Sequence, residues 1–149
     1  MKLPAHKQAI LDAIEKTCLQ RKINLTHQRK IVLTIMLNAE KAMSAYELLD
    51  LLKIEESQAK PPTIYRVLTF LLSQGFIHKV ESSNSFILCP HFSRPNHISI
   101  LFICDSCQQI TEQHDEVLEE HLLNLSQKNQ FNTKHSIIEI HGFCHLCQS

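Results

Sequence analysis

Two features of membrane and secreted proteins are missing from this sequence. None of its apolar runs approaches the roughly 20 residues that a transmembrane helix needs. The start, MKLPAHKQAILDAIEK, spreads charges through an amphipathic pattern and lacks the apolar core and small-residue cleavage site of a secretory signal. We therefore expect a cytoplasmic protein. In that reducing compartment the six cysteines are expected to be metal ligands or redox groups rather than disulfides.

Net charge is also missing, because 15 basic side chains balance 15 acidic ones. The balance hides an asymmetry: residues 1–83 carry twelve Lys and Arg against eight Asp and Glu, whereas residues 84–149 carry three against seven. Seven of the ten histidines and five of the six cysteines lie in the second part. Composition therefore predicts a module that binds a polyanion joined to a module that binds metal. A charge of +4 is modest, so two ordinarily solvated surfaces are the plain alternative.

The first part of the chain is predicted to form four helices followed by a β-hairpin. The first helix spans residues 4–20, Thr26 is a candidate N-cap of the second, and Ser44 and Glu47 have capping-box spacing at the third. PPTIYRVLTFLLSQG is the fourth, opened by two prolines and closed by a glycine. FIHKVE and SFILC then flank SSN, which is a hairpin signal. This order predicts a winged helix-turn-helix, whose second helix enters the DNA major groove.

Apolar residues at helical spacing predict which side of each helix is buried. In the fourth helix Tyr65, Arg66 and Thr69 are left on the outer side, where they would face DNA. The expected inward residues are Ile10, Ala13, Ile14 and Cys18, then Ile31, Val32, Ile35 and Met36, then Leu48, Leu51 and Leu52, and finally Val67, Leu68, Leu71 and Leu72.

A segment with two prolines, CPHFSRPN, divides the chain. Beyond it HISILFIC and HSIIEIHG read as strands, and DEVLEEHLLNLSQKNQ reads as a helix with Val117, Leu118, Leu122 and Leu125 at helical spacing. We therefore predict an α+β fold: a winged-helix DNA-binding domain over 1–84, a connector over 85–96, and a small α/β dimerisation and metal-binding domain over 97–149. Because so small a domain buries little apolar area, we expect a structural metal ion or a dimer partner to stabilise it.

Two CxxC pairs, CDSC and CHLC, lie in this small second domain. Two such turns can place Cys104, Cys107, Cys144 and Cys147 in a tetrahedral sulfur shell that suits zinc. A shell with no open position predicts a structural role. The alternative, redox-active pairs, is disfavoured because neither pair is predicted to sit in a βαβ pattern.

A second metal site is predicted from ligands that straddle the domain boundary. His78 lies in the expected wing, Cys89 in the connector and His97 at the start of the next strand, while Glu112 follows the first CxxC pair. Two imidazoles, one thiolate and one carboxylate suit zinc better than iron. The spacing alone leaves a solvated histidine and a packing cysteine open as alternatives. The remaining histidines do not select a third site.

DNA contact is expected from the fourth helix and from basic residues around it. Tyr65 could reach a thymine methyl, and the other candidates for base or phosphate contact are Arg66, Thr63, Lys60, Lys30 and Arg29. A zinc deaminase is an alternative because HDE precedes CHLC, but the proline of the deaminase P-C-x-x-C motif is missing and Cys104 and Cys107 would have no role. We expect no enzymatic activity, no small organic substrate and no membrane partner.

The motifs LTHQR, SAYELLDLL, AKPPTIYRVLTFLLSQGFIHKVES, CDSC and HGFCHLC, in this order, resemble the ferric uptake regulator family, most closely its zinc-sensing branch. The resemblance implies a homodimeric repressor that binds AT-rich palindromes upstream of zinc-uptake genes and holds two zinc ions per chain. It places the structural zinc on the four cysteines of the CxxC pairs, the regulatory zinc on His78, Cys89, His97 and Glu112, and DNA contacts on Tyr65 and Arg66. Where iron-sensing relatives carry a histidine run and an aspartate, this chain has RPNH, which argues against iron; an iron or peroxide sensor on the same scaffold is the nearest alternative.

Overall fold

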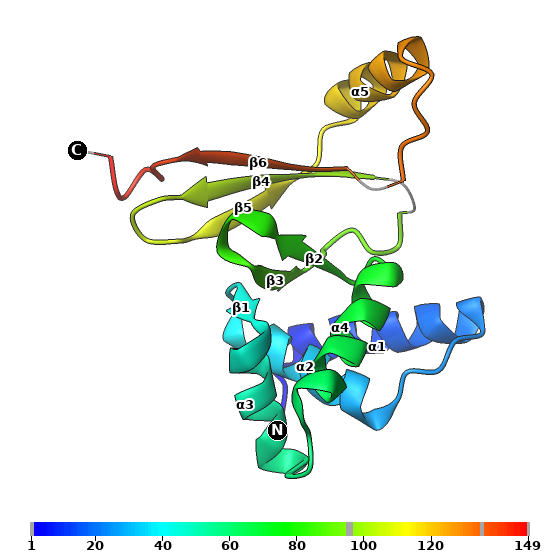
Figure 1. Cartoon of the computed structure of the whole chain (residues 1–149), viewed down its shortest axis with the longest axis vertical. Helices are drawn as coiled ribbons and strands as arrows, with labels where there is room; N and C mark the ends of the chain where they lie inside the picture. Colours follow the sequence, from blue (N-terminus) through cyan, green and yellow to red (C-terminus); the bar gives the residue numbers. More distant parts are fainter. Residues whose placement is uncertain (1, 95–96, 135, 149) are drawn as a thin grey trace. The chain divides into compact units, whose positions relative to one another are not determined.

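The structure is a computed structural model that describes residues 2–94, 97–134 and 136–148. The chain forms two compact units, Met1–Ser93 and Arg94–Ser149. The predicted α+β class is confirmed. In chain order the elements are α1 (Ala5–Arg21), α2 (His27–Ala39), β1 (Met43–Ser44), α3 (Ala45–Glu55), α4 (Pro61–Ser73), β2 (Ile77–Val80), a 3-10 turn (Glu81–Ser83), β3 (Ser85–Leu88), β4 (Ile98–Cys104), β5 (Ile110–Gln113), α5 (Glu116–Lys128) and β6 (Ser136–Gly142) (Figure 1).

Helix starts in the first unit lie where the sequence predicts them. The Thr26 hydroxyl accepts a hydrogen bond from the Arg29 N–H at 3.4 Å and caps α2. At α3 the Ser44 hydroxyl accepts from the Glu47 N–H, and the Glu47 carboxylate accepts from the Ser44 N–H, so the capping box is complete. After α4, Gly75 takes φ +75°, a left-handed conformation that glycine adopts without steric penalty. Local chemistry therefore sets these boundaries.

The core of the first unit is formed by all four helices and the adjoining strands. The predicted inward residues of α2 and α4 are buried or partly buried, and Tyr65, Arg66 and Thr69 lie exposed on the outer side of α4. The prediction for α1 was partly wrong. Ile10 is 40% exposed and Ala13 is exposed, whereas Leu11 is buried with Ile14 and Cys18. The buried stripe of α1 therefore includes position 11 in place of positions 10 and 13.

The wing is a three-stranded sheet of order β1-β3-β2, in which β3 is antiparallel to both neighbours. The predicted hairpin is confirmed: β2 and β3 pair with His78 opposite Ile87, and Asn84 turns the chain with φ +48°. The two-residue strand β1, which pairs Met43 with Phe86, was not predicted.

The second unit is a three-stranded sheet of order β5-β4-β6 with one helix. β4 is antiparallel to β5 and parallel to β6, so the chain crosses from β4 to β6 through β5 and α5. Strand β5 was not predicted. Several apolar residues of α5 are exposed: Val117 is 79% exposed and Leu125 42% exposed, and no residue of the helix is buried by the described residues. No helix among the described residues has the length and apolar character needed to cross a membrane.

Candidate metal centre and nucleic-acid interface

The four cysteines of the CxxC pairs converge at one end of the second unit's sheet. Cys104 is the last residue of β4, and its register partner Gly142 is the last residue of the parallel strand β6. Both CxxC pairs therefore lie at the same end of the sheet. One Sγ atom from each of the four cysteines lies within 4.8 Å of all the others. The sequence prediction that the two pairs meet at one centre agrees with this geometry.

Backbone hydrogen bonds shape both CxxC turns. The Gln108 N–H donates to the Cys104 carbonyl at 2.9 Å, with Gln108 in the left-handed region at φ +64°. In the second turn the Cys147 N–H donates to the Cys144 carbonyl at 2.9 Å. The Cys144 N–H also donates to Cys104 Sγ at 3.4 Å, which links the two turns. The sulfurs are therefore held by backbone that is already ordered.

The sulfur spacing fits a tetrahedral zinc ion. Zn–S bonds of about 2.3 Å give sulfur–sulfur edges of about 3.8 Å in a regular tetrahedron. Cys107 Sγ and Cys144 Sγ lie 3.8 Å apart. A disulfide would instead need about 2.05 Å, and none of the six cysteines, which all lie in the described part of the chain, forms one.

The protonation of these thiols also favours a cation. Hydrogen bonds from the backbone of Cys107 and Cys144 lower the pKa of the Cys104 thiol to about 6. The neighbouring Cys144 side chain raises the pKa of the Cys147 thiol to about 12. Four thiolates at these distances repel one another, so all four ionise together only around a positive charge. The donor set and its spacing fit zinc.

The prediction that neither CxxC pair lies in a βαβ pattern is wrong. The pairs were expected to lie outside any crossover, yet β4 and β6 are parallel strands joined through a helix. The stronger reason is geometric, because the sulfurs of two separate CxxC pairs gather in one cluster. Dithiol–disulfide redox chemistry needs only one CxxC pair.

The other predicted ligands form two pairs, one in each unit. In the first unit the Cys89 N–H donates to the Phe76 carbonyl at 2.9 Å, which extends the β2–β3 pairing by one position. Because side chains alternate along strands, Cys89 and His78 project from the same face of the hairpin. Both side chains are buried. The wing therefore presents a thiol and an imidazole together.

The second unit presents the other pair in the same way. His97 directly precedes β4, and Glu112 on β5 stands opposite Leu101. Positions 97 and 101 share a face of β4, so His97 and Glu112 lie on a common face of the sheet. Both are partly buried. His97 is also oriented by its Nδ1 atom, which lies 2.7 Å from the Arg94 carbonyl oxygen.

The candidate DNA-binding residues divide into exposed and structurally engaged groups. Tyr65, 47% exposed, and Arg66 project from α4 into solvent. Thr63 is buried, and its hydroxyl accepts the Lys60 N–H at 3.1 Å at the start of the helix. The Arg29 guanidinium lies 3.5 Å from the Phe70 ring centroid and donates to the Asn24 carbonyl. The outer side of α4 is therefore the open part of the predicted interface.

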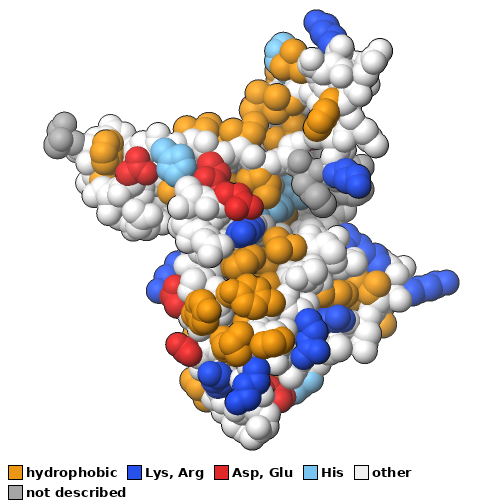
Figure 2. All heavy atoms as spheres, viewed as in Figure 1, with side chains coloured by type: hydrophobic (Ala, Val, Ile, Leu, Met, Phe, Trp, Pro, Cys, Tyr) orange, Lys and Arg blue, Asp and Glu red, His pale blue; other side chains and the backbone are white. Residues whose placement is uncertain are grey.

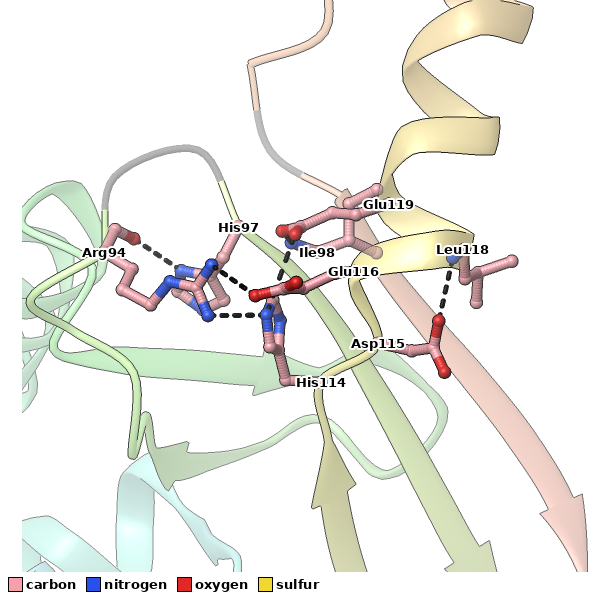
Figure 3. Close-up of polar contacts among 8 residues, drawn as sticks. All are labelled: Arg94, His97, Ile98, His114, Asp115, Glu116, Leu118 and Glu119. Carbon is pink, nitrogen blue, oxygen red and sulfur yellow. Dashed lines mark hydrogen bonds and ion pairs between the residues drawn. The ribbon is translucent and has the colours of Figure 1, made fainter.

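Sequence reasoning missed a polar cluster around the start of α5. Arg94, His114, Glu116 and Glu119 come together there, with His97 beside them (Figure 3). These residues are up to 25 positions apart in sequence. No spacing rule joins them, so no signal in the sequence could have identified the cluster.

Comparison with known proteins identifies relatives along almost the whole chain. Residues 20–141 match the model of the ferric uptake regulator family. The zinc uptake regulation protein of Escherichia coli (strain K12) is 50% identical over 140 residues, which cover 94% of this chain and 82% of that protein. A solved structure of a zinc uptake regulator complexed with zinc and DNA has a TM-score of 0.89 and 48% identity, covering 96% of this chain and 95% of its own. The crystal structure of holo XcZur has a TM-score of 0.83 and 35% identity, covering 93% and 96%. The chain belongs to the ferric uptake regulator family.

Proposed function

We propose that the protein is a cytoplasmic, zinc-dependent repressor that binds the operators of zinc-uptake genes as a homodimer. The observation that carries the proposal is the division of the second ligand set. The hairpin of the first unit offers His78 and Cys89 from one face, and the sheet of the second offers His97 and Glu112 from one face. The 50% identity to a zinc uptake regulation protein supports zinc as the metal.

Two zinc ions per chain are proposed, with different roles. The four-cysteine centre would be structural, because four thiolates leave no open position. The second set combines one thiolate with two imidazoles and one carboxylate, a mixture that suits zinc better than iron. Its ligands would be the regulatory ones, because they come from the DNA-binding unit and from the unit that follows it.

Regulation follows from the chain's two-unit organisation. Without a link between the units, the winged helices of a dimer take many orientations, and few of them match two successive major grooves. When bound, zinc would supply bonds to both units at once. Bonds from zinc to His78 and Cys89 and to His97 and Glu112 would fix the orientation of the two units. The apparent DNA affinity would then rise by the inverse of the fraction of zinc-free molecules whose orientation already permits DNA binding. The coupling is reciprocal, so operator DNA would tighten zinc binding by the same factor.

Contact with DNA is proposed for the exposed side of α4. Tyr65 would pack against a thymine methyl, and Arg66 would bind a base edge or phosphate. Lys60 at the helix start would neutralise a phosphate. Thr63 would act by fixing the N-terminal turn of α4, because its hydroxyl is engaged by the Lys60 N–H. Arg29 would reach a phosphate only by leaving the Phe70 ring.

The homodimer would form through the uncovered face of the second unit. Two adjoining grooves of about 740 and 600 Å³ share Phe102, Gln113 and Ile140, and the first is walled by α5. Figure 2 shows hydrophobic side chains gathered along α5 and the neighbouring sheet. We assign this face to a second copy of the chain, because a twofold dimer would present two winged helices to an AT-rich palindromic operator.

The experiment is a zinc titration of DNA binding with metal stoichiometry measured in parallel. We expect two zinc ions per chain, and we expect operator binding to appear as the second zinc ion binds. His78→Ala and Cys89→Ser should keep the dimer and one zinc but lose zinc-dependent binding. Operator affinity equal to wild type in these variants, with and without chelator, would refute the switch. One zinc plus a redox-active iron in the wild type would instead identify an iron or peroxide sensor.

A further inference from the structure

We infer that Arg94 is a positioning residue for the regulatory zinc ligand His97, which it links to the corner between β5 and α5 (Figure 3). The inference rests on the proposed function, because it concerns His97 as a zinc ligand. Arg94 acts at two ends: its backbone carbonyl contacts the His97 ring, and its guanidinium contacts the cluster around α5.

The backbone end fixes the tautomer of His97. Nδ1 of His97 lies 2.7 Å from the Arg94 carbonyl oxygen. A carbonyl can only accept, so the ring must donate through Nδ1–H. The lone pair of the neutral ring is then on Nε2, which becomes the metal-binding atom. Hydrogen bonds of this kind to the second ring nitrogen orient histidine ligands and raise their basicity.

The guanidinium end anchors that carbonyl to the β5–α5 corner. Nη1 of Arg94 lies 2.6 Å from Nε2 of His114. Arginine can only donate, so Nε2 of His114 is the acceptor in this contact. The same atom lies 3.8 Å from the Glu119 carboxylate, which is longer than a hydrogen bond. The 3.9 Å contact of Arg94 with Glu116 is long and solvent-exposed, so we assign the anchoring mainly to His114.

A second contact links Ile98, the residue that follows His97, to the first turn of α5. The Glu119 carboxylate accepts a hydrogen bond from the Ile98 N–H at 2.8 Å. The turn itself is capped, because Asp115 Oδ1 accepts the Leu118 N–H at 2.8 Å. Contacts from α5 and its N-terminal corner therefore reach the chain both before and after His97. The fixed positive charge of Arg94 lies beside Glu116 and His114, where it partly balances the Glu116 carboxylate.

Removing the guanidinium should weaken zinc at the second site and leave the four-cysteine site unchanged. Loss of an outer-shell partner commonly reduces metal affinity by about 10- to 100-fold. Because Arg94→Ala keeps the carbonyl that contacts His97 and removes only its anchor, we expect a loss near the lower end of that range, about 10-fold. Arg94→Lys should recover part of the loss, because an ammonium group can donate one hydrogen bond to His114. Lys128→Ala, which removes a positive charge at the far end of α5, is the matched control.

The test measures Zn²⁺ affinity by chelator competition and records the absorption spectrum of Co²⁺ at the second site, with one structural zinc already bound. We expect a weaker affinity and an altered cobalt spectrum for Arg94→Ala, no change for Lys128→Ala, and no further loss when His114→Ala is added to Arg94→Ala. Retained structural zinc shows that the second unit is folded, and Arg94→Met, which has no hydrogen-bond donor, replaces Arg94→Ala if the latter does not fold.

Two results would overturn the inference while leaving the proposed function intact. The first is Arg94→Ala affinity and spectrum within twofold of wild type. The second is additive losses from Arg94→Ala and His114→Ala, which would mean that Arg94 does not act through His114. A wild-type protein that takes up only one zinc would refute the proposed function and the inference together.

Discussion

Phe102 offers the sharpest test of the proposed dimer face. It lies on β4, lines both grooves and is 46% exposed. A phenylalanine carries about 200 Å² of surface, so roughly 90 Å² would be covered in the dimer, and about two thirds of that would be lost in Phe102→Ala. At about 25 cal/mol per Å² this is about 1.5 kcal/mol per copy. Twofold symmetry counts it twice, which gives about 3 kcal/mol, or roughly a hundredfold in the dimer dissociation constant.

The assay is sedimentation equilibrium over a range of concentrations, with the four-cysteine zinc bound. Phe131→Ala is the matched control, because Phe131 is 67% exposed and lines neither groove. We expect Phe102→Ala to dissociate at concentrations where wild type and Phe131→Ala remain dimers. Equal dissociation constants for wild type and Phe102→Ala, or equal weakening by both substitutions, would show that this face does not hold the dimer.

Three further predictions concern the two units separately. Ser44→Ala removes half of the capping box of α3 and should lower the free energy of unfolding of the first unit by about 1 kcal/mol in urea titrations. Leu52→Ala empties a fully buried core position and should lower it by about 2–5 kcal/mol, whereas Ile54→Ala, 75% exposed, should change it little. The His141 pKa is raised by its contacts with Asp105 and Glu139. Protonated His141 therefore stabilises the folded state fully at pH values below the pKa of an unfolded histidine, about 6.5. This contribution is lost as the pH rises through the pKa of His141 in the folded protein, so the melting temperatures of wild type and His141→Gln should converge at alkaline pH.

Features set by neighbouring residues could be predicted from the sequence. The caps at Thr26 and Ser44 depend on a side chain and a backbone group three positions apart. The turns of the CxxC pairs are equally local, and four identical ligands in two short motifs admit few other arrangements. In α4 the contrast between apolar and polar positions is strong, so its exposed side was predicted as well.

Features set by distant residues could not be predicted. The choice between Ile10 and Leu11 in α1 depends on how that helix is rotated against the core, and both residues are apolar. Strands β1 and β5 have only two and four residues, which is too short for a clear alternating pattern. Arg94 meets His114 only because the chain folds back through β4 and β5. The helical spacing of the apolar residues in α5 was predicted, but no residue of this helix is buried among the described residues.

The uncovered helix and the cysteine centre have a shared consequence for stability. In the second unit, the described buried side chains all come from β4, and α5 contributes none. So small a core gives little stability by itself. A metal that binds only the folded unit and a partner that covers its apolar face both add stability by mass action, and each therefore favours the other. We expect Cys107→Ser, or a chelator strong enough to remove metal from the four-cysteine centre, to shift the protein from dimer to monomer as well as lower its melting temperature. A dimer that persists unchanged after complete removal of metal would show that the apolar face is organised without the cysteine centre.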